Sequence, residues 1–119
     1  MAKLKNGASW RYQPVYIDEP IGRLVTLIEA HFDENGIFSM WTEGDACPAG
    51  EDAQELAADL NRMMVDALSW EPAPRSDLKP GYVFERRISM EERLKLVDYV
   101  MEVKDAMNNR AIPKQQRPN

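Results

Sequence analysis

The sequence predicts an α+β fold: a three- or four-stranded antiparallel sheet covered by one helix, with a second, long C-terminal helix after it. Three patterns carry this prediction. Two β-rich runs flank a turn at residues 33–36, a capped helical stripe begins at Asp52, and another capped apolar run begins at Ser89. Paired strands followed by capped helices are typical of α+β proteins.

The first strand is expected at residues 10–17, which are rich in aromatic and β-branched side chains and end at an Asp-Glu-Pro turn signal. Pro14 lies inside this run and has no N–H to donate. We therefore expect this strand to lie at an edge of the sheet or to carry a bulge at Pro14.

The strongest β pattern is a hairpin formed by residues 23–32 and 37–42. Asp33 at the first turn position and Gly36 at the fourth suit a type I turn closed by a left-handed residue.

This turn sets the expected strand register, in which Phe32 lies opposite Phe38 and Ala30 lies opposite Met40. The apolar face of the hairpin then consists of Ile28, Ala30, Phe32, Phe38 and Met40. We expect the first helix to cover this face and Trp41 to lie on the opposite one.

The first helix is predicted over residues 52–69. Asp52 and Glu55 have the spacing of a capping box, in which each side chain accepts a hydrogen bond from a backbone N–H of the first turn. The side chains expected to pack on the sheet recur at helical spacing and are Leu56, Leu60, Met63 and Ala67.

The remainder of the chain predicts an extended connector, a short strand and the second helix. Three prolines and a glycine mark the connector at residues 71–81, and residues 82–88 have strand character. Ser89 and Glu92 form a second capping box that opens a helix at 89–108. Its apolar side chains cover more of its circumference than one sheet face can bury.

This excess apolar surface predicts a binding site for another protein or for a second copy of the chain. The expected partner-binding residues are Trp41, Leu96, Val100, Val103 and Met107. One alternative stays open, in which the second helix crosses the other face of the sheet and buries Trp41 in a three-layer core.

Length and composition predict one soluble cytoplasmic domain over residues 10–109, with flexible tails at 1–9 and 110–119. No apolar run is long enough to span a membrane, and a single cysteine indicates a reducing compartment. Residues 18–71 carry thirteen acidic side chains against two basic ones, which disfavours nucleic acid as a partner.

No group of residues predicts catalysis, so we expect no enzyme, no metal and no cofactor. His31 is the only imidazole, and no cysteine or second histidine lies at ligand spacing from it. Cys47 has no base close in sequence, and the chain has no glycine-rich phosphate loop.

The segment from Phe32 to Leu68 resembles a family of small bacterial proteins of unknown function. The shared features are the turn Asp33-Glu34-Asn35-Gly36, the run Trp41-Thr42-Glu43, Pro48, Gly50-Glu51 and the capped helix with spaced apolar residues. More distantly, the segment is similar to the toxin-binding domain of HicB-like antitoxins. Both resemblances imply a sheet covered by a helix, and neither implies an activity.

The expected function is that of a non-catalytic protein-binding adaptor or regulatory subunit in a protein complex. One alternative is an antitoxin-like DNA-binding regulator, because Glu85-Arg86-Arg87 before a Ser-capped helix is how a ribbon-helix-helix unit begins. Such a unit needs a second helix after a break, and residues 89–109 contain no glycine or proline. The other alternative is a small enzyme of unknown chemistry.

Overall fold

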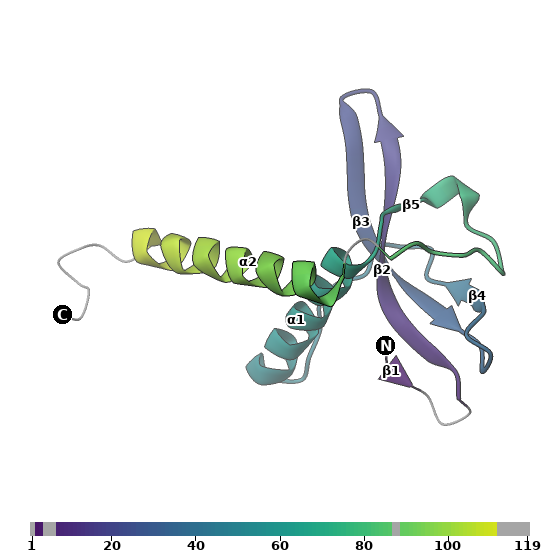
Figure 1. Ribbon diagram of the computed structural model, residues 1–119, viewed down its shortest axis with the longest axis horizontal. Coiled ribbons are helices and arrows are strands. Elements are labelled where there is room, and N and C mark those ends of the chain that lie inside the picture. Colours follow the sequence, from purple (N-terminus) through teal and green to yellow (C-terminus); the bar gives the residue numbers. More distant parts are fainter. Residues whose placement is uncertain (1, 4–6, 87–88, 112–119) are drawn as a thin grey trace. The chain divides into compact units, whose positions relative to one another are not determined.

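The structure, a computed structural model, describes residues 2–3, 7–86 and 89–111. They belong to two compact units that divide between residues 87 and 88. The elements of the first unit are β1 (Ala2–Lys3), β2 (Ser9–Glu19), β3 (Gly22–Phe32), β4 (Phe38–Trp41), α1 (Ala53–Ser69), β5 (Ala73–Pro74) and a 3-10 turn at Arg75–Asp77. The second unit contains α2 (Met90–Ala111) (Figure 1).

The first unit confirms the α+β prediction. Strands β1 to β4 form an antiparallel sheet in the order β1-β2-β3-β4, and α1 packs against β2. The short strand β5 pairs with β2 in parallel, so the sheet is mixed. Strand β1 lies within the segment that the sequence indicates as a tail.

The expectation of an edge strand or of a bulge at Pro14 is wrong, because β2 lies between β1 and β3, and Pro14 lies opposite Leu27 without interrupting the pairing with β3. The backbone N–H of Tyr12 points away from β3 and donates to Asp66 of α1 at 3.0 Å. Because backbone direction alternates along a strand, the nitrogen of Pro14 faces the same side. That side of β2 is paired by β1 as far as Trp10 and by β5 from Val15, so Pro14 occupies the gap between them.

The predicted hairpin turn is confirmed. The side chain of Asp33 accepts hydrogen bonds from the N–H groups of Asn35 at 2.8 Å and Ile37 at 3.0 Å. Gly36 donates its N–H to the Asp33 carbonyl at 2.9 Å and has a φ of 78°, which glycine adopts without strain. The turn therefore follows from two residue types at fixed positions.

The predicted register is right at the turn and wrong beyond it. Phe32 pairs with Phe38 as expected, but a bulge then places Met40 opposite His31 and Trp41 opposite Ala30. A shift of one residue reverses the faces of the side chains that follow. Met40 is consequently exposed, and Trp41 stacks on Phe38 with ring centroids 5.2 Å apart.

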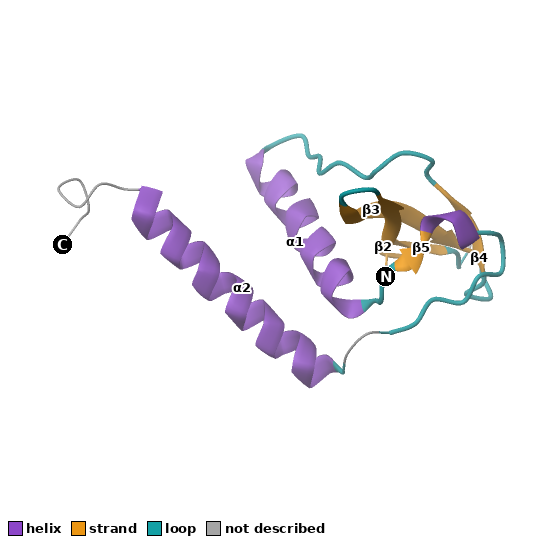
Figure 2. Cartoon of the chain, turned by 90° about the horizontal axis from the view of Figure 1, so that it is seen from above, coloured by secondary structure: helices purple, strands orange, loops and turns teal. Residues whose placement is uncertain are grey.

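The helix α1 does not cover the face that the sequence indicates. Its contacts are with Tyr12, whose hydroxyl donates to Asp59 at 2.5 Å, and with Trp10, whose ring lies 5.1 Å from the Arg62 guanidinium. Trp10 and Tyr12 alternate with Arg11 along β2, so α1 lies on the face opposite Arg11. Figure 2 shows α1 beside the sheet.

The connector after α1 covers the face expected for the helix. The buried cluster on this face consists of Ala30, Phe32, Phe38, Ala73 and Phe84. Partly buried side chains that pack against it are Trp41, Trp70, Leu78 and Tyr82. In α1 itself only Met63 of the expected apolar stripe is buried, and Leu60 is 47% exposed.

The N-cap hydrogen bond of each predicted capping box is confirmed. Asp52 accepts the N–H of Glu55 at 2.8 Å, and the Glu55 carboxylate accepts the N–H of Glu51 rather than that of Asp52. At the start of α2, the Ser89 hydroxyl accepts the N–H of Glu92 at 3.2 Å.

The strand predicted at residues 82–88 is wrong for its described part, residues 82–86. This stretch forms a single bridge between Arg86 and Trp70, and residues 87–88 lie outside the described residues. Among the described helices, none is long and apolar enough to cross a membrane.

Candidate functional site

The most unusual side chain of the first unit is Arg11, which is only 3% exposed. Its Nε and Nη2 donate to the Gln13 side-chain oxygen at 3.2 and 2.7 Å. The guanidinium carbon lies 3.6 Å from the ring centroid of Trp70, 4.5 Å from that of Phe32 and 5.2 Å from that of Phe84. Arg11 therefore lies among three aromatic rings that come from two distant parts of the chain.

The environment of Arg11 lowers the pKa of its guanidinium but leaves the group charged. Burial lowers the pKa of Arg11 from 12.5 to about 10, with a smaller lowering from Arg86. Asp66 opposes the fall in pKa, because its carboxylate stabilises the charged guanidinium. Since a pKa near 10 is well above neutrality, Arg11 stays a cation at pH 7.

A cavity of about 180 Å³ opens beside this cation. Arg11 lines it, and half of its ten lining residues are aromatic, namely Phe32, Phe38, Trp70, Tyr82 and Phe84. The rings of Phe38 and Phe84 meet edge to face, with centroids 4.9 Å apart. Small-molecule sites usually measure about 300–1,000 Å³, so this cavity has room for one side chain rather than for a substrate.

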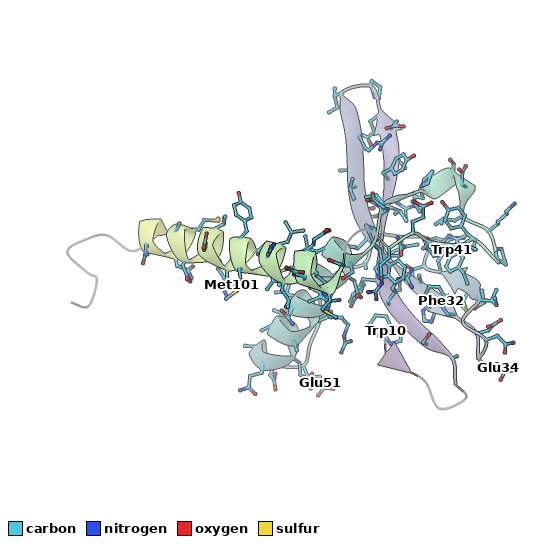
Figure 3. The ribbon with its side chains drawn as sticks, in the orientation of Figure 1. Trp10, Phe32, Glu34, Trp41, Glu51 and Met101 are labelled. Atoms are coloured by element: carbon cyan, nitrogen blue, oxygen red, sulfur yellow. The ribbon has the colours of Figure 1, made fainter. Side chains whose placement is uncertain are left out.

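Trp41, a predicted partner-binding residue, lies at the margin of the same aromatic cluster. It is partly buried, and its stacking on Phe38 puts it on the core face of the sheet. In Figure 3 the side chains of Phe32 and Trp41 lie together near β4. The bulge in the hairpin is the reason that sequence alternation placed Trp41 on the wrong face.

The other predicted partner-binding residues lie on α2. Leu96, Val100, Val103 and Met107 recur at spacings of four, three and four residues and form one stripe, which we call stripe A. The sequence pattern holds a second stripe that the prediction did not separate, stripe B, formed by Met90, Leu94, Val97 and Met101. At 100° per residue the two stripes are about 120° apart on the helix.

Several side chains of this helix are exposed although they are apolar. Tyr99 is 62% exposed, and Val103 and Met107 of stripe A are also exposed. The polar side of α2 is formed by Glu91, Lys95, Asp98, Glu102 and Asp105. Apolar side chains therefore cover two sides of α2, and these five charged side chains form the third, whereas Arg93 and Lys104 lie between the two stripes.

Two carboxylates attach α1 to β2, and their environments differ. Hydrogen bonds from the Tyr12 hydroxyl and the Ala49 N–H lower the pKa of Asp59, which lies near solvent. Burial instead raises the pKa of Asp66, although the Tyr12 N–H and nearby cations oppose the rise. Asp59 and Asp66 thus have structural roles that explain their positions.

The residues weighed for chemistry lie apart. His31 is partly exposed on β3, and Cys47 is exposed in the loop before α1, with its Sγ 3.9 Å from the Asp45 carbonyl oxygen. Within the described ranges, no three His, Cys, Asp or Glu side chains are grouped so that they could hold a metal ion.

No family model, curated protein or solved structure matches the chain. The resemblances to the small bacterial family and to HicB-like antitoxins therefore stay predictions.

Proposed function

We propose that this chain is a non-catalytic adaptor or regulatory subunit that binds another protein through α2. The observation that carries the proposal is the exposed apolar surface of this helix, of which Tyr99, Val103 and Met107 are members. Covering each such side chain contributes roughly 1.5–3 kcal/mol. Contiguous exposed apolar patches usually mark interaction sites.

The division into stripes A and B supports the same proposal. A helix that packs on a single surface needs one apolar stripe, whereas α2 has two about 120° apart. A single contact surface can therefore cover one of the two stripes, and the other stripe needs a second surface. Methionines occur in both stripes, and their flexible side chains suit a surface that adapts to its partner.

The DNA-binding alternative receives less support. A ribbon-helix-helix unit contains a basic strand and two helices, whereas α2 runs from Met90 to Ala111 without a break and residues 82–86 are not a strand. The acidic composition of residues 18–71 also opposes phosphate binding.

The proposal is tested by paired substitutions on α2. The native partner is first identified by co-purification from the host with the wild-type chain, followed by mass spectrometry. Replacing both Val100 and Met107 of stripe A by Asp should lower the affinity for that partner at least about tenfold, because it places charges in an apolar contact. Asn109→Asp adds the same kind of charge on the polar side and should leave the affinity unchanged.

Circular dichroism of the Val100→Asp, Met107→Asp variant separates an interface from a core. A folded spectrum with lost binding supports the proposal, whereas loss of the folded spectrum would assign stripe A to the core. Salt provides the second discrimination: affinity for a phosphate-bearing partner falls steeply with salt, and affinity for an apolar protein surface does not.

A further inference from the structure

The outer edge of β3 is covered along only part of its length. The carbonyls of Leu27 and Glu29 accept hydrogen bonds from Ala46 and Thr42, at 2.7 and 3.1 Å, so the loop after β4 covers the backbone of this edge from Leu27 onward. Asp45 of the same loop is hydrogen-bonded to the Thr26 side chain, which leaves the Thr26 backbone uncovered. Between Gly22 and Thr26, no strand of the described residues pairs with β3 on the side away from β2. We call residues 22–26 the open edge; Figure 1 shows this hairpin extending past β4 and β5.

The direction of the backbone groups along the open edge follows from those further along the strand. Leu27 and Glu29 direct their carbonyls outward, and alternate residues of a strand point the same way. Arg23 and Val25 therefore also direct N–H and C=O groups away from β2. Leu24, between them, directs its backbone groups toward β2.

The side chains of the open edge do not protect it from pairing. Leu24 and Val25 are 46% and 48% exposed, and Ile21 at the adjoining turn is almost fully exposed. In natural proteins, lysine, proline or a bulge commonly keeps an edge strand from pairing with another chain, and residues 22–26 contain none of these.

The one charge on the open edge is held against its own hairpin. The Arg23 guanidinium lies 3.8 Å from the ring centroid of Tyr16, and its Nε is 3.1 Å from the Asp18 carboxylate. Arg23 therefore neither projects outward along the edge nor carries an uncompensated charge.

We infer that the open edge pairs with the open edge of a second copy of the chain, antiparallel about a two-fold axis at Leu24. In this pairing Arg23 of each copy lies opposite Val25 of the other, and all outward N–H and C=O groups of both residues are satisfied. Leu24 meets its own counterpart as a non-hydrogen-bonded pair, the arrangement in which facing side chains are closest. The two sheets become one continuous sheet.

Three features favour a second copy as the occupant. Leu24 is the midpoint of the open edge, so a two-fold axis there lets the outward backbone groups of Arg23 and Val25 in the two copies pair with one another. The loop after β4 stops the pairing at Leu27 at either end. No like charges face each other, because Arg23 lies opposite a valine. Since five residues a side form a small interface, we expect association that depends on concentration.

Sedimentation equilibrium of the full chain over a concentration series tests the pairing. Val25→Pro removes an outward N–H without removing a bond to β2, just as Pro14 does in β2, and should weaken dimerisation at least about tenfold. Val25→Thr keeps the N–H and the strand preference, and should retain the dimer within about threefold.

A charge exchange at the two-fold axis provides the decisive comparison. Leu24→Lys and Leu24→Glu should each be monomeric, because like charges meet at the axis, and an equimolar mixture should form a 1:1 dimer. A wild-type chain that stays monomeric at all concentrations overturns the inference, as does a dimer that Val25→Pro leaves intact. A dimer lost only in the Val100→Asp, Met107→Asp variant would instead assign self-association to α2, so the two proposals fail separately.

Discussion

A single carboxylate, Asp66, makes the stability of the first unit dependent on pH. It closes the gap on the outer side of β2 by accepting the Tyr12 N–H, and burial raises its pKa. An acid whose pKa is higher in the folded state favours folding at low pH, and this contribution is lost as pH rises through the folded value.

We therefore expect Asp66→Asn to stabilise the protein at neutral pH. The amide oxygen still accepts the Tyr12 N–H, and the cost of burying a charge is removed. The advantage over the wild type should shrink as pH falls and disappear below about pH 4, where the wild-type side chain is protonated in both states. Urea midpoints of both proteins from acid to neutral pH measure this, and a constant difference would contradict it.

Arg11 illustrates what residue-level reasoning leaves undetermined. Strand periodicity places Arg11 and Gln13 on one face of β2, but their burial depends on Trp70 and Phe84, which return to that face from more than fifty residues away. No local pattern in the sequence shows where a connector crosses a sheet. The aromatic cavity could therefore not be predicted, although the sequence contains each of the aromatic residues that line it.

Elements whose signal is local were predicted well. The Asp33 turn, the Asp52 cap and the Ser89 cap each depend on side chains within four residues, and all three are present. The pairing of Ala30 was mispredicted because the bulge after Phe38 has no glycine or proline to mark it. The face covered by α1 was also mispredicted, because both faces of the sheet carry large side chains.

The helix α1 provides a direct test of its orientation. Met63→Ala should cost about 2–5 kcal/mol of unfolding free energy, because this side chain is buried. Leu60→Ala should cost less than about 1 kcal/mol, because almost half of that side chain is already in solvent. Chemical denaturation of the two variants compares them directly. Equal losses would mean that the helix packs through the face predicted from its apolar stripe.

At the scale of the whole molecule, the buried aromatic cluster lies entirely within the first unit. Its members belong to β3, β4, β5 and the segment before residue 87. A truncated chain of residues 1–87 should therefore unfold cooperatively and keep the near-ultraviolet circular dichroism of its packed tryptophans. A truncated chain that is unfolded would show that α2 belongs to the core, as in the three-layer alternative.

The connector after α1, within the first unit, ends beside the residues where it begins. Glu71 donates its N–H to the Glu85 carbonyl at 2.9 Å, and Trp70 forms a bridge with Arg86, so the intervening chain closes on itself. Closing a somewhat longer loop costs only about 0.6 kcal/mol for each doubling of its length. Residues inserted near the 3-10 turn would leave both ends of this loop in place. The fold can therefore acquire new surface there during evolution while the path from α1 to residue 86 keeps its anchor points.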